Sequence, residues 1–559
     1  MLKEGRIWMA KSDKDLCIIP KMANRHGLIA GATGTGKTIT MKVMAESFSD
    51  MGVPVFFSDV KGDLSGMCEP GVDNENMQKR IAYFGIDGFN YKSYPARFWD
   101  IFGENGHPVR VTISDMGPTL LSRLLSLTDV QEGVLNIVFK AADDNGLLLL
   151  DLKDLRAMLQ YVGDNRQEYT LEYGNVTSQS IGAIQRALLK FEDEGGDIFF
   201  GEPDLDIRDW MRTDFDGRGY INILSSNRLI QSPTVYATFL LWMMTELFEK
   251  LPEVGDLDKP RMIFFFDEAH LLFADAPKAM VQKIVQVVKL IRSKGVGIYF
   301  VTQSPSDIPD EVLAQLSNRI QHGLRAYTPA EMKAIRAAAQ SFRTNPAFDS
   351  EEALKEIGTG EALVSFLDED GVPTVVEKAK ILPPQSLMGP ADSSKVKSII
   401  ASDEFDLKYR ENVDRESAYE IILQARQKLE EEAAAQAEEE EKIKAEQQAA
   451  KEAEKAEKEA AKEAARIEKE EAKAAKEAAK AEKEANKKKD AVSKAAQRAV
   501  SNAASSVARS VSTNAINSVL GGKTASGKTI AKRAATNALS SVMRSGTNSI
   551  LRGLFGNKK

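Results

Sequence analysis

Short apolar runs alternate with amphipathic segments over roughly the first 390 residues of the chain. The apolar runs predict buried strands at residues 28–30, 53–57, 109–113, 219–224, 262–266, 296–301 and 319–324. Apolar positions spaced by about 3.6 residues predict helices at residues 39–48, 234–250 and 278–293. Strands that alternate with helices form a parallel sheet covered on both faces. The pattern therefore predicts an α/β fold with a mainly parallel sheet.

Two further patterns add detail to this fold. Four amphipathic helices are predicted between residues 119 and 193, which indicates a helical insertion between core strands. Short strands are expected at residues 6–9 and 16–19, and a hairpin is expected at residues 362–367 and 372–378. Packing is the expected task of the Leu-rich faces in the insertion.

The C-terminal third of the chain has a different composition. Residues 431–490 are almost entirely Ala, Glu, Lys and Gln, without the repeated apolar seam of a coiled coil. This composition is typical of charged helical spacers held by Glu–Lys pairs four residues apart, and partial disorder is the alternative. Residues 391–430 are expected to form a helical linker before it.

The last segment, residues 491–559, contains no Asp or Glu and eleven Lys or Arg, on a chain whose net charge is −8. Such a basic tail favours DNA or an anionic membrane surface as its partner. Docking of the tail on the acidic remainder of the same chain is the alternative. The chain has two cysteines, no apolar leader at its start and no run of 18 apolar residues, so a cytoplasmic protein is expected.

Residues 31–38 read GATGTGKT and fit the pattern G-x-x-x-x-G-K-[ST] between a predicted strand and a predicted helix. Backbone N–H groups of such a loop hold phosphate oxygens at the positive end of the helix. The motif predicts ATP binding with Mg²⁺, Lys37 on the phosphates and the Thr38 hydroxyl on the metal. The predicted nucleotide-binding residues are Gly31, Thr33, Gly34, Thr35, Gly36, Lys37 and Thr38. Residues 522–529 match the same pattern, but no buried strand precedes them and no carboxylate follows, so we reject them.

The most hydrophobic predicted strand, residues 262–266, ends in Asp267 and Glu268. We expect Asp267 to hold Mg²⁺ and Glu268 to orient and deprotonate the attacking water. Asp59, at the end of another strand, is a further candidate metal ligand, with a turn or helix cap as its alternative. Helix capping is likewise the alternative for Glu268.

Three other side chains complete the predicted site. Gln303 follows the next strand and would sense the γ-phosphate, with a turn role as its alternative. His270 is expected to be a polar link rather than a metal ligand. An arginine that neutralises transition-state charge often comes from a neighbouring subunit. Among Arg292, Arg319 and Arg325, we favour Arg292 because it closes a helix just before an active-site strand.

These segments resemble the bacterial HerA-like ATPases of the HerA–FtsK branch over roughly residues 5–390. The segments that carry the resemblance are GATGTGKT (31–38), FFSDVKGDLSG (56–66), FFFDEAHLLF (264–273), LIRSKGVGIYFVTQSP (290–305), NRIQHGLRAYTP (318–329) and GEALVSFL (360–367). The resemblance implies a RecA-like P-loop core, a homo-hexameric ring and ATP-driven DNA translocation. It places the family's lysine, acidic pair, glutamine and trans-acting arginine on Lys37, Asp267 with Glu268, Gln303 and Arg292.

The chain also departs from HerA itself. The β-barrel that precedes the ATPase core in HerA has no room in the first 25 residues, which leaves a nuclease partner uncertain. We divide the chain into a first core part (1–118), a helical insertion (119–218), a second core part (219–390), a linker (391–430), a charged spacer (431–490) and a basic tail (491–559). Two functions remain open, a DNA-stimulated ring motor and an ATP-dependent assembly switch or scaffold. A two-domain helicase would need a second RecA-like domain, and none is visible after residue 390.

Overall fold

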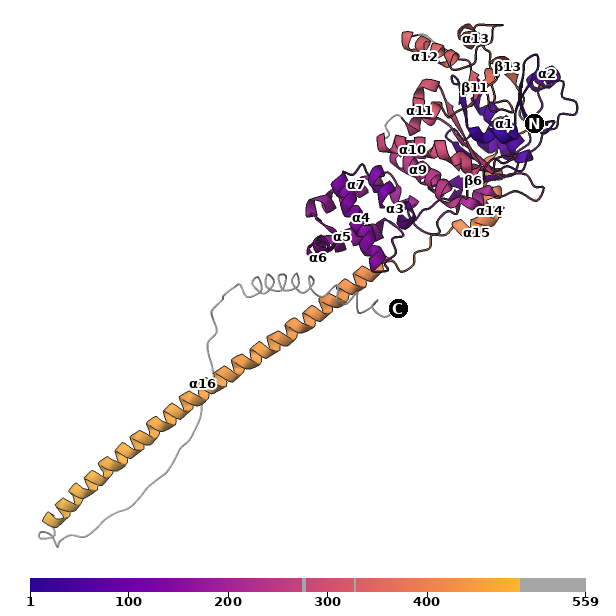
Figure 1. The fold of residues 1–559 in the computed structure, drawn as a ribbon. Helices are drawn as coiled ribbons and strands as arrows, with labels where there is room; N and C mark the ends of the chain where they lie inside the picture. Colours follow the sequence, from indigo (N-terminus) through magenta and orange to yellow (C-terminus); the bar gives the residue numbers. More distant parts are fainter. Residues whose placement is uncertain (274–277, 326–327, 493–559) are drawn as a thin grey trace. The chain divides into compact units, whose positions relative to one another are not determined.

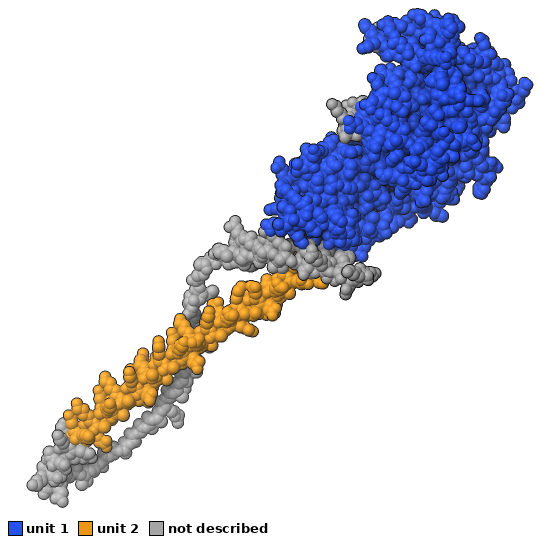
Figure 2. All heavy atoms as spheres, viewed as in Figure 1, with its two compact units in different colours: residues 1–423 blue, residues 424–559 orange. Residues whose placement is uncertain are grey.

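The computed structural model describes residues 1–273, 278–325 and 328–492. The chain divides into two units, residues 1–423 and residues 424–559, which Figure 2 colours blue and orange. The first unit contains the sheet and the candidate site. The second unit, as far as it is described, continues one long helix. None of the described helices is long and apolar enough to span a bilayer.

The described residues form one 13-stranded sheet with the order β1-β2-β13-β12-β11-β4-β10-β9-β5-β8-β6-β7, and β3 pairs with β2. The strands are β1 (Leu2–Lys3), β2 (Arg6–Lys11), β3 (Asp15–Ile18), β4 (Gly27–Ala30), β5 (Val55–Asp59), β6 (Ala96–Asp100), β7 (His107–Pro108), β8 (Ile221–Ser225), β9 (Met262–Phe266), β10 (Val296–Thr302), β11 (Asn318–His322), β12 (Glu361–Ser365) and β13 (Glu377–Ile381). The central strands from β11 to β7 are parallel, and β12 and β13 pair antiparallel. The predicted α/β fold with a mainly parallel sheet is confirmed.

The helices follow the strands in the alternation that the apolar pattern predicts (Figure 1). They are α1 (Lys37–Asp50), α2 (Glu75–Phe84), α3 (Ile113–Leu124), α4 (Asp129–Asp144), α5 (Leu152–Asp164), α6 (Arg166–Tyr173), α7 (Ser178–Asp193), α8 (Gly196–Phe199), α9 (Pro233–Lys250), α10 (Lys278–Leu290), α11 (Asp310–Leu313), α12 (Pro329–Gln340), α13 (Ser350–Glu356), α14 (Ser393–Ser402), α15 (Glu404–Tyr409) and α16 (Ala418–Val492). Helices α3 to α7 lie together in Figure 1, and the boundaries of the expected insertion stay a prediction.

The predicted strand at residues 109–113 is wrong. Val111 makes only an isolated parallel bridge with Phe200, and Ile113 already begins α3. Thr112 caps that helix, because its hydroxyl accepts the backbone N–H of Asp115. The apolar side chains of this run are buried, but a polar cap inside the run turns the chain into a helix.

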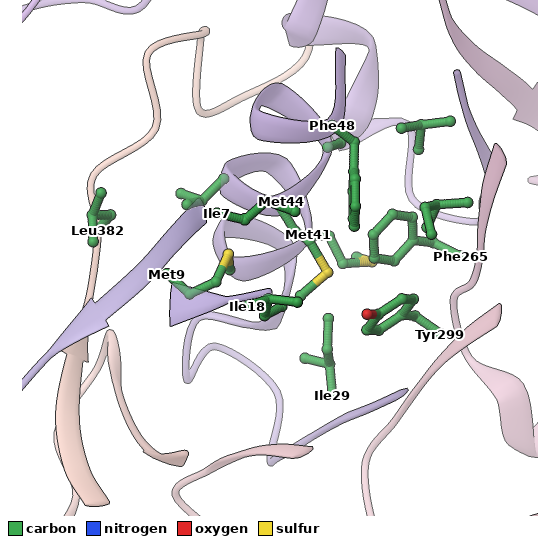
Figure 3. Packing of buried hydrophobic residues seen from close by; sticks show 14 of the residues in the cluster. Ile7, Met9, Ile18, Ile29, Met41, Met44, Phe48, Phe265, Tyr299 and Leu382 are labelled. Atoms are coloured by element: carbon green, nitrogen blue, oxygen red, sulfur yellow. The ribbon is translucent and has the colours of Figure 1, made fainter. Parts of the chain in front are cut away.

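The main core lies between α1 and one face of the sheet. Met41, Met44 and Phe48 of α1 pack in one buried cluster with Phe265 of β9 and Tyr299 of β10 (Figure 3). All five side chains are almost fully buried. This packing fixes the helix that follows the phosphate loop against the strands that carry the other candidate residues.

The charged spacer is helical in the described residues. Helix α16 has 75 residues, and Lys442 and Lys444 pair with Glu438 and Glu440 four residues earlier. Ion pairs of this spacing support a helix whose residues 434–484 are exposed. The basic tail lies outside the described residues apart from its first two, so its predicted partners stay predictions.

Candidate active site

Parallel strand order brings the predicted site residues to one edge of the sheet. Strand β10 lies between β4 and β9, and β9 is followed by β5. The four strands are parallel, so their carboxyl ends share one edge. The phosphate loop leaves β4 there, Gln303 leaves β10, Asp267 and Glu268 leave β9, and Asp59 ends β5. Ligands bind at this edge in open α/β sheets.

The backbone of the loop depends on its glycines. Gly31 has a φ of 154°, and a Cβ there would lie 2.5 Å from the Cβ of His322. Gly36 has a φ of 117° and caps α1. The N–H groups of Gly31 and Ala32 donate to the carbonyls of Thr302 and Gly323, which anchor the start of the loop to the ends of β10 and β11. The loop is therefore held in shape by its neighbouring strands.

Lys37 opens α1 and is buried. Its Nζ donates to the carbonyl oxygens of Gly31 at 2.6 Å and Ala32 at 3.3 Å, which keeps the ammonium inside the curve of the loop. Burial lowers the pKa of Lys37, although the negative charge of Glu268 acts in the opposite direction. A buried ammonium with only carbonyl partners is suited to receive a phosphate oxygen.

The acidic pair stands immediately after β9. Both residues are buried, and the backbone N–H of Glu268 donates to Oδ1 of Asp267 at 2.9 Å. Burial and the adjacent charge of Glu268 raise the pKa of Asp267 to about 6. Glu268 has a φ of 49°, a left-handed backbone conformation that is uncommon outside glycine. Such strained positions cluster at functional sites.

Three side chains surround the carboxylate of Glu268. Nζ of Lys61 lies 2.9 Å from Oε1. On the other oxygen, Nε2 of Gln303 donates to Oε2 at 3.4 Å, and Nδ1 of His270 also lies 3.4 Å from Oε2. Burial alone would raise the pKa of Glu268, but the hydrogen bond and charge of Lys61 bring that pKa below its usual value.

Lys61 is a residue of this site that sequence reasoning missed. It stands two residues after the end of β5, in the segment VKGD, and no local pattern distinguishes it from a surface lysine. Two signals were available: its position just after a strand predicted to end at the ligand-binding edge, and its place in the segment FFSDVKGDLSG (56–66) that carries the family resemblance. Nδ1 of His270 lies near Oε2 of Glu268, and its role as a polar link stays a prediction.

Asp59 forms a turn in this structure. Its Oδ1 accepts the N–H groups of Lys61 and Gly62, and its Oδ2 accepts the N–H of Leu64 at 3.0 Å. Burial raises the pKa of Asp59 against the effect of these donors. Both carboxylate oxygens therefore serve the backbone, which is the alternative we named from the sequence. Metal ligation by Asp59 stays an untested prediction.

The candidate arginines occupy three different environments. Arg292 precedes β10, at the opposite end of that strand from Gln303, and its guanidinium lies 3.3 Å from Asp256. The structure thus does not bring Arg292 to the site of its own chain. Arg319 is half-buried and donates to backbone carbonyls of Leu313, Leu316 and Ser341, which is a structural role. Arg325 lines the cavity beside the loop.

That cavity has a volume of about 930 Å³. Its lining includes Ala32 and Thr33 of the loop together with Gln303, His270 and Arg325. Gln303, which follows β10, and Arg325, which lies three residues after β11, thus line the same cavity as the loop residues. The volume is sufficient for a ligand of nucleotide size.

The residues present fit a magnesium nucleotide. The loop supplies a buried ammonium, and Asp267 supplies a buried carboxyl group at the end of β9. Within the described ranges, no three His, Cys, Asp or Glu side chains cluster as a metal site by themselves. Protein sites usually give Mg²⁺ one or two carboxylates and leave the remaining ligand positions to phosphate and water.

A glycine loop between a strand and a helix, with an acidic pair at the end of a strand of the same sheet, defines a P-loop NTPase. The chain belongs to the family described as Helicase HerA-like C-terminal, which matches residues 4–528.

Two archaeal relatives share this similarity. The DNA double-strand break repair helicase HerA of Sulfolobus acidocaldarius is 20% identical over 351 residues, which are 61% of this chain and 62% of that protein. The HerA of Sulfurisphaera tokodaii is 22% identical over 379 residues, covering 65% and 67% of the two chains. The chain thus spans about three fifths of the length of the first relative. Among solved structures, the plasmid coupling protein TrwB in complex with ADP and Mg²⁺ is similar with a TM-score of 0.44 and 14% identity, over 71% of this chain and 88% of TrwB.

Proposed function

We propose that the protein hydrolyses ATP and couples this reaction to movement along DNA as a homo-hexameric ring. The observation that carries the proposal is the meeting of Lys37, Glu268 and Gln303 at one edge of the sheet in a chain of the HerA-like family. The names of the two archaeal relatives, both DNA double-strand break repair helicases, support the DNA part of the proposal.

Each side chain has a distinct task in this reaction. Lys37 neutralises charge on the phosphate groups, and the loop amides hold the phosphate oxygens in place. Glu268 accepts a hydrogen bond from the attacking water and takes its proton as the water oxygen bonds to the γ-phosphorus, while the bond from that phosphorus to the bridging oxygen breaks and ADP leaves. Gln303, which already contacts Glu268, orients the same water or the terminal phosphate. When Mg²⁺ is bound, Thr38 and Asp267 would hold it, and it supplies further charge neutralisation.

The ring is proposed from the position of Arg292, which lies away from the site of its own chain, whereas Arg325 lines the cavity there. Arg292 lies at the other end of β10 and is 41% exposed at its side chain, so it can serve an adjacent copy. An arginine supplied by a neighbouring subunit makes hydrolysis depend on subunit contact, which suits a ring motor whose subunits hydrolyse ATP in coordination.

The alternative is an ATP-dependent assembly switch or scaffold without strand separation. The observation in its favour is α16, whose 75 residues form an exposed charged helix suited to tether a partner. In that case the basic tail would bind a partner or an anionic membrane surface. A nuclease partner would fit either function, and neither requires it.

ATP turnover with and without duplex DNA separates these functions. The wild type and Glu268→Gln are assayed at 50 and 200 mM salt. A motor is expected to turn over faster with DNA at low salt and to lose that stimulation at high salt, because phosphate contacts are screened. Glu268→Gln is expected to bind ATP and to hydrolyse it far more slowly than the wild type. Turnover that is indifferent to DNA would contradict the motor, and a wild type without ATPase activity would contradict both functions.

A further inference from the structure

Lys61 contacts the residue that we assign as the general base. Its Nζ lies 2.9 Å from Oε1 of Glu268, and the two side chains are 39% and 9% exposed. The two residues are separated by 207 positions in the chain and meet because β5 and β9 are parallel neighbours. The ion pair thus joins the ends of two strands at the candidate active site.

The main chain of Lys61 is itself fixed. Asp59 accepts the N–H groups of Lys61, Gly62 and Leu64 at 3.2, 2.8 and 3.0 Å. Gly62 has a φ of 81°, so the turn needs a residue without a side chain at this position. A buried carboxylate thereby holds the turn on the end of β5. Because the backbone of this turn is fixed, the side chain of Lys61 extends toward Glu268 from a fixed position.

Glu268 is held on both oxygens. Oε1 faces Lys61, and Oε2 faces Gln303 and His270. Of these three contacts, the one to Lys61 is the shortest and joins full opposite charges. A carboxylate with two rotatable bonds beyond its Cβ needs such contacts to keep one orientation. Loss of Lys61 would leave only the two weaker contacts, both on Oε2.

If the ion pair had only a structural role, its loss would change the stability of the protein very little. Ion pairs with one half-exposed partner contribute about 0 to 1 kcal/mol to stability. Loss of the ion pair is instead expected to reduce the rate of hydrolysis, because a displacement of a catalytic group by about 1 Å can lower the rate on the order of 100-fold.

We propose that Lys61 is a positioning residue that fixes the carboxylate of Glu268 in the orientation needed to activate water. The inference rests on the proposed ATP hydrolysis and gives a role to a residue of the segment FFSDVKGDLSG (56–66) for which the sequence predicts none. Lys61 acts through Glu268 and need not touch the nucleotide.

The test compares Lys61→Met with Lys61→Arg in the full chain. Turnover of ATP is measured as kcat, and binding is measured separately as the Kd of a fluorescent non-hydrolysable ATP analogue. For Lys61→Met, kcat is expected to fall about 10- to 100-fold while Kd changes less than about threefold. Lys61→Arg keeps a charge at this position and is expected to recover a large part of kcat.

Lys14→Met is the matched control. Lys14 also forms an ion pair, 2.7 Å from Glu377, but between the β2–β3 turn and β13. This variant loses one lysine and one ion pair, and it is expected to keep wild-type kcat and Kd. Thermal melting of every variant checks folding, and Lys61→Gln replaces Lys61→Met if the latter does not fold.

A double-variant cycle tests whether Lys61 acts through Glu268. Single-turnover rates are measured for Glu268→Gln alone and together with Lys61→Met. If Lys61 acts through Glu268, the double variant is no slower than Glu268→Gln. An additional loss of rate in the double variant would overturn the proposal, because Lys61 would then have a task of its own.

Other outcomes are equally decisive. If the wild-type protein is active and kcat of Lys61→Met equals or exceeds its kcat, the positioning role is overturned and the proposed function is not. A rise in Kd that matches the fall in kcat assigns Lys61 to phosphate binding and also overturns it. A wild type without ATPase activity overturns the proposed function, and this inference with it.

Discussion

The hydroxyl of Thr40 and Nε2 of His322 are joined by a buried hydrogen bond of 2.8 Å. This bond connects the first turn of α1 to the end of β11, directly under the phosphate loop. The other ring nitrogen, Nδ1, lies 2.9 Å from the carbonyl oxygen of Glu361. A carbonyl can only accept, so Nδ1 carries the proton and Nε2 accepts from Thr40. The imidazole is thereby fixed in its neutral form and packs against Gly31 and Gly36. Neither glycine has a Cβ, so the ring fits beside them.

This buried ring predicts acid sensitivity. Burial lowers the pKa of both His322 and His26 to about 4, against an ordinary value of 6.5. Between pH 6.5 and 4 the unfolded chain binds more protons, so stability is complete above this window and falls as the pH decreases through it. Each histidine accounts for up to about 3 kcal/mol of this loss. Urea unfolding at pH 7.5, 6.0 and 5.0 measures this decrease in the free energy of unfolding.

The control for this prediction is His322→Gln, which keeps hydrogen-bonding groups and cannot be charged. Its free energy of unfolding should change less with pH than that of the wild type. Equal pH dependence in the two proteins would contradict the assignment of the effect to His322.

A second prediction concerns Glu46, a fully buried carboxylate on α1. It accepts the backbone N–H groups of Gln385 and Ser386 at 2.9 Å and the hydroxyl of Ser386 at 2.6 Å. Glu46→Ala leaves these donors buried without a partner and should cost about 3–5 kcal/mol. Chemical denaturation is the measurement.

The comparison for Glu46 is Glu75→Ala on α2. Glu75 pairs with Lys79, but its side chain is 81% exposed, so the change should be within about 0.5 kcal/mol. A similar decrease in the free energy of unfolding in the two variants would contradict a stabilising role of the buried contacts of Glu46.

A third prediction concerns the loop glycine at position 31. In Gly31→Ala, the new Cβ would stand 2.5 Å from the Cβ of His322, so either the loop or β11 must move. The Kd for a non-hydrolysable ATP analogue should rise at least about tenfold, because the loop amides would no longer converge on phosphate. Isothermal titration calorimetry measures this change.

Gly85→Ala provides the matching backbone control. Gly85 also has a left-handed φ, 65°, at the end of α2, with open space around it. The substitution should cost about 1 kcal/mol in stability and leave nucleotide affinity unchanged. A similar loss of affinity in both variants would count against a specific role of the loop.

A fourth prediction tests Arg292 as a residue that serves a neighbouring subunit. Arg292→Ala and Lys37→Ala are each expected to abolish most ATPase activity. Mixed rings should regain some activity, because a subunit with intact Lys37 can meet a neighbour with intact Arg292. The mixture is assayed over a range of ratios after subunit exchange. Activity that never exceeds the sum of the separate variants would contradict action between subunits.

The local sequence was sufficient to predict much of this protein. The apolar run at residues 262–266 coincides with β9, and GATGTGKT forms the loop between β4 and α1 as its spacing predicts. Asp267, Glu268 and Gln303 could be placed because each directly follows an apolar strand. The prediction failed at residues 109–113, where Thr112 caps a helix inside an apolar run.

The tertiary structure alone decided which of these strand ends meet. Lys61 reaches Glu268 because β5 adjoins β9, and His322 lies under Gly31 because β11 adjoins β4. Strand order also places Arg292 at the far end of β10, away from the loop of its own chain. A motif or an apolar period records the conformation of a short segment. Contacts between segments that are hundreds of residues apart depend on the packing of the whole sheet, and no local pattern specifies that order.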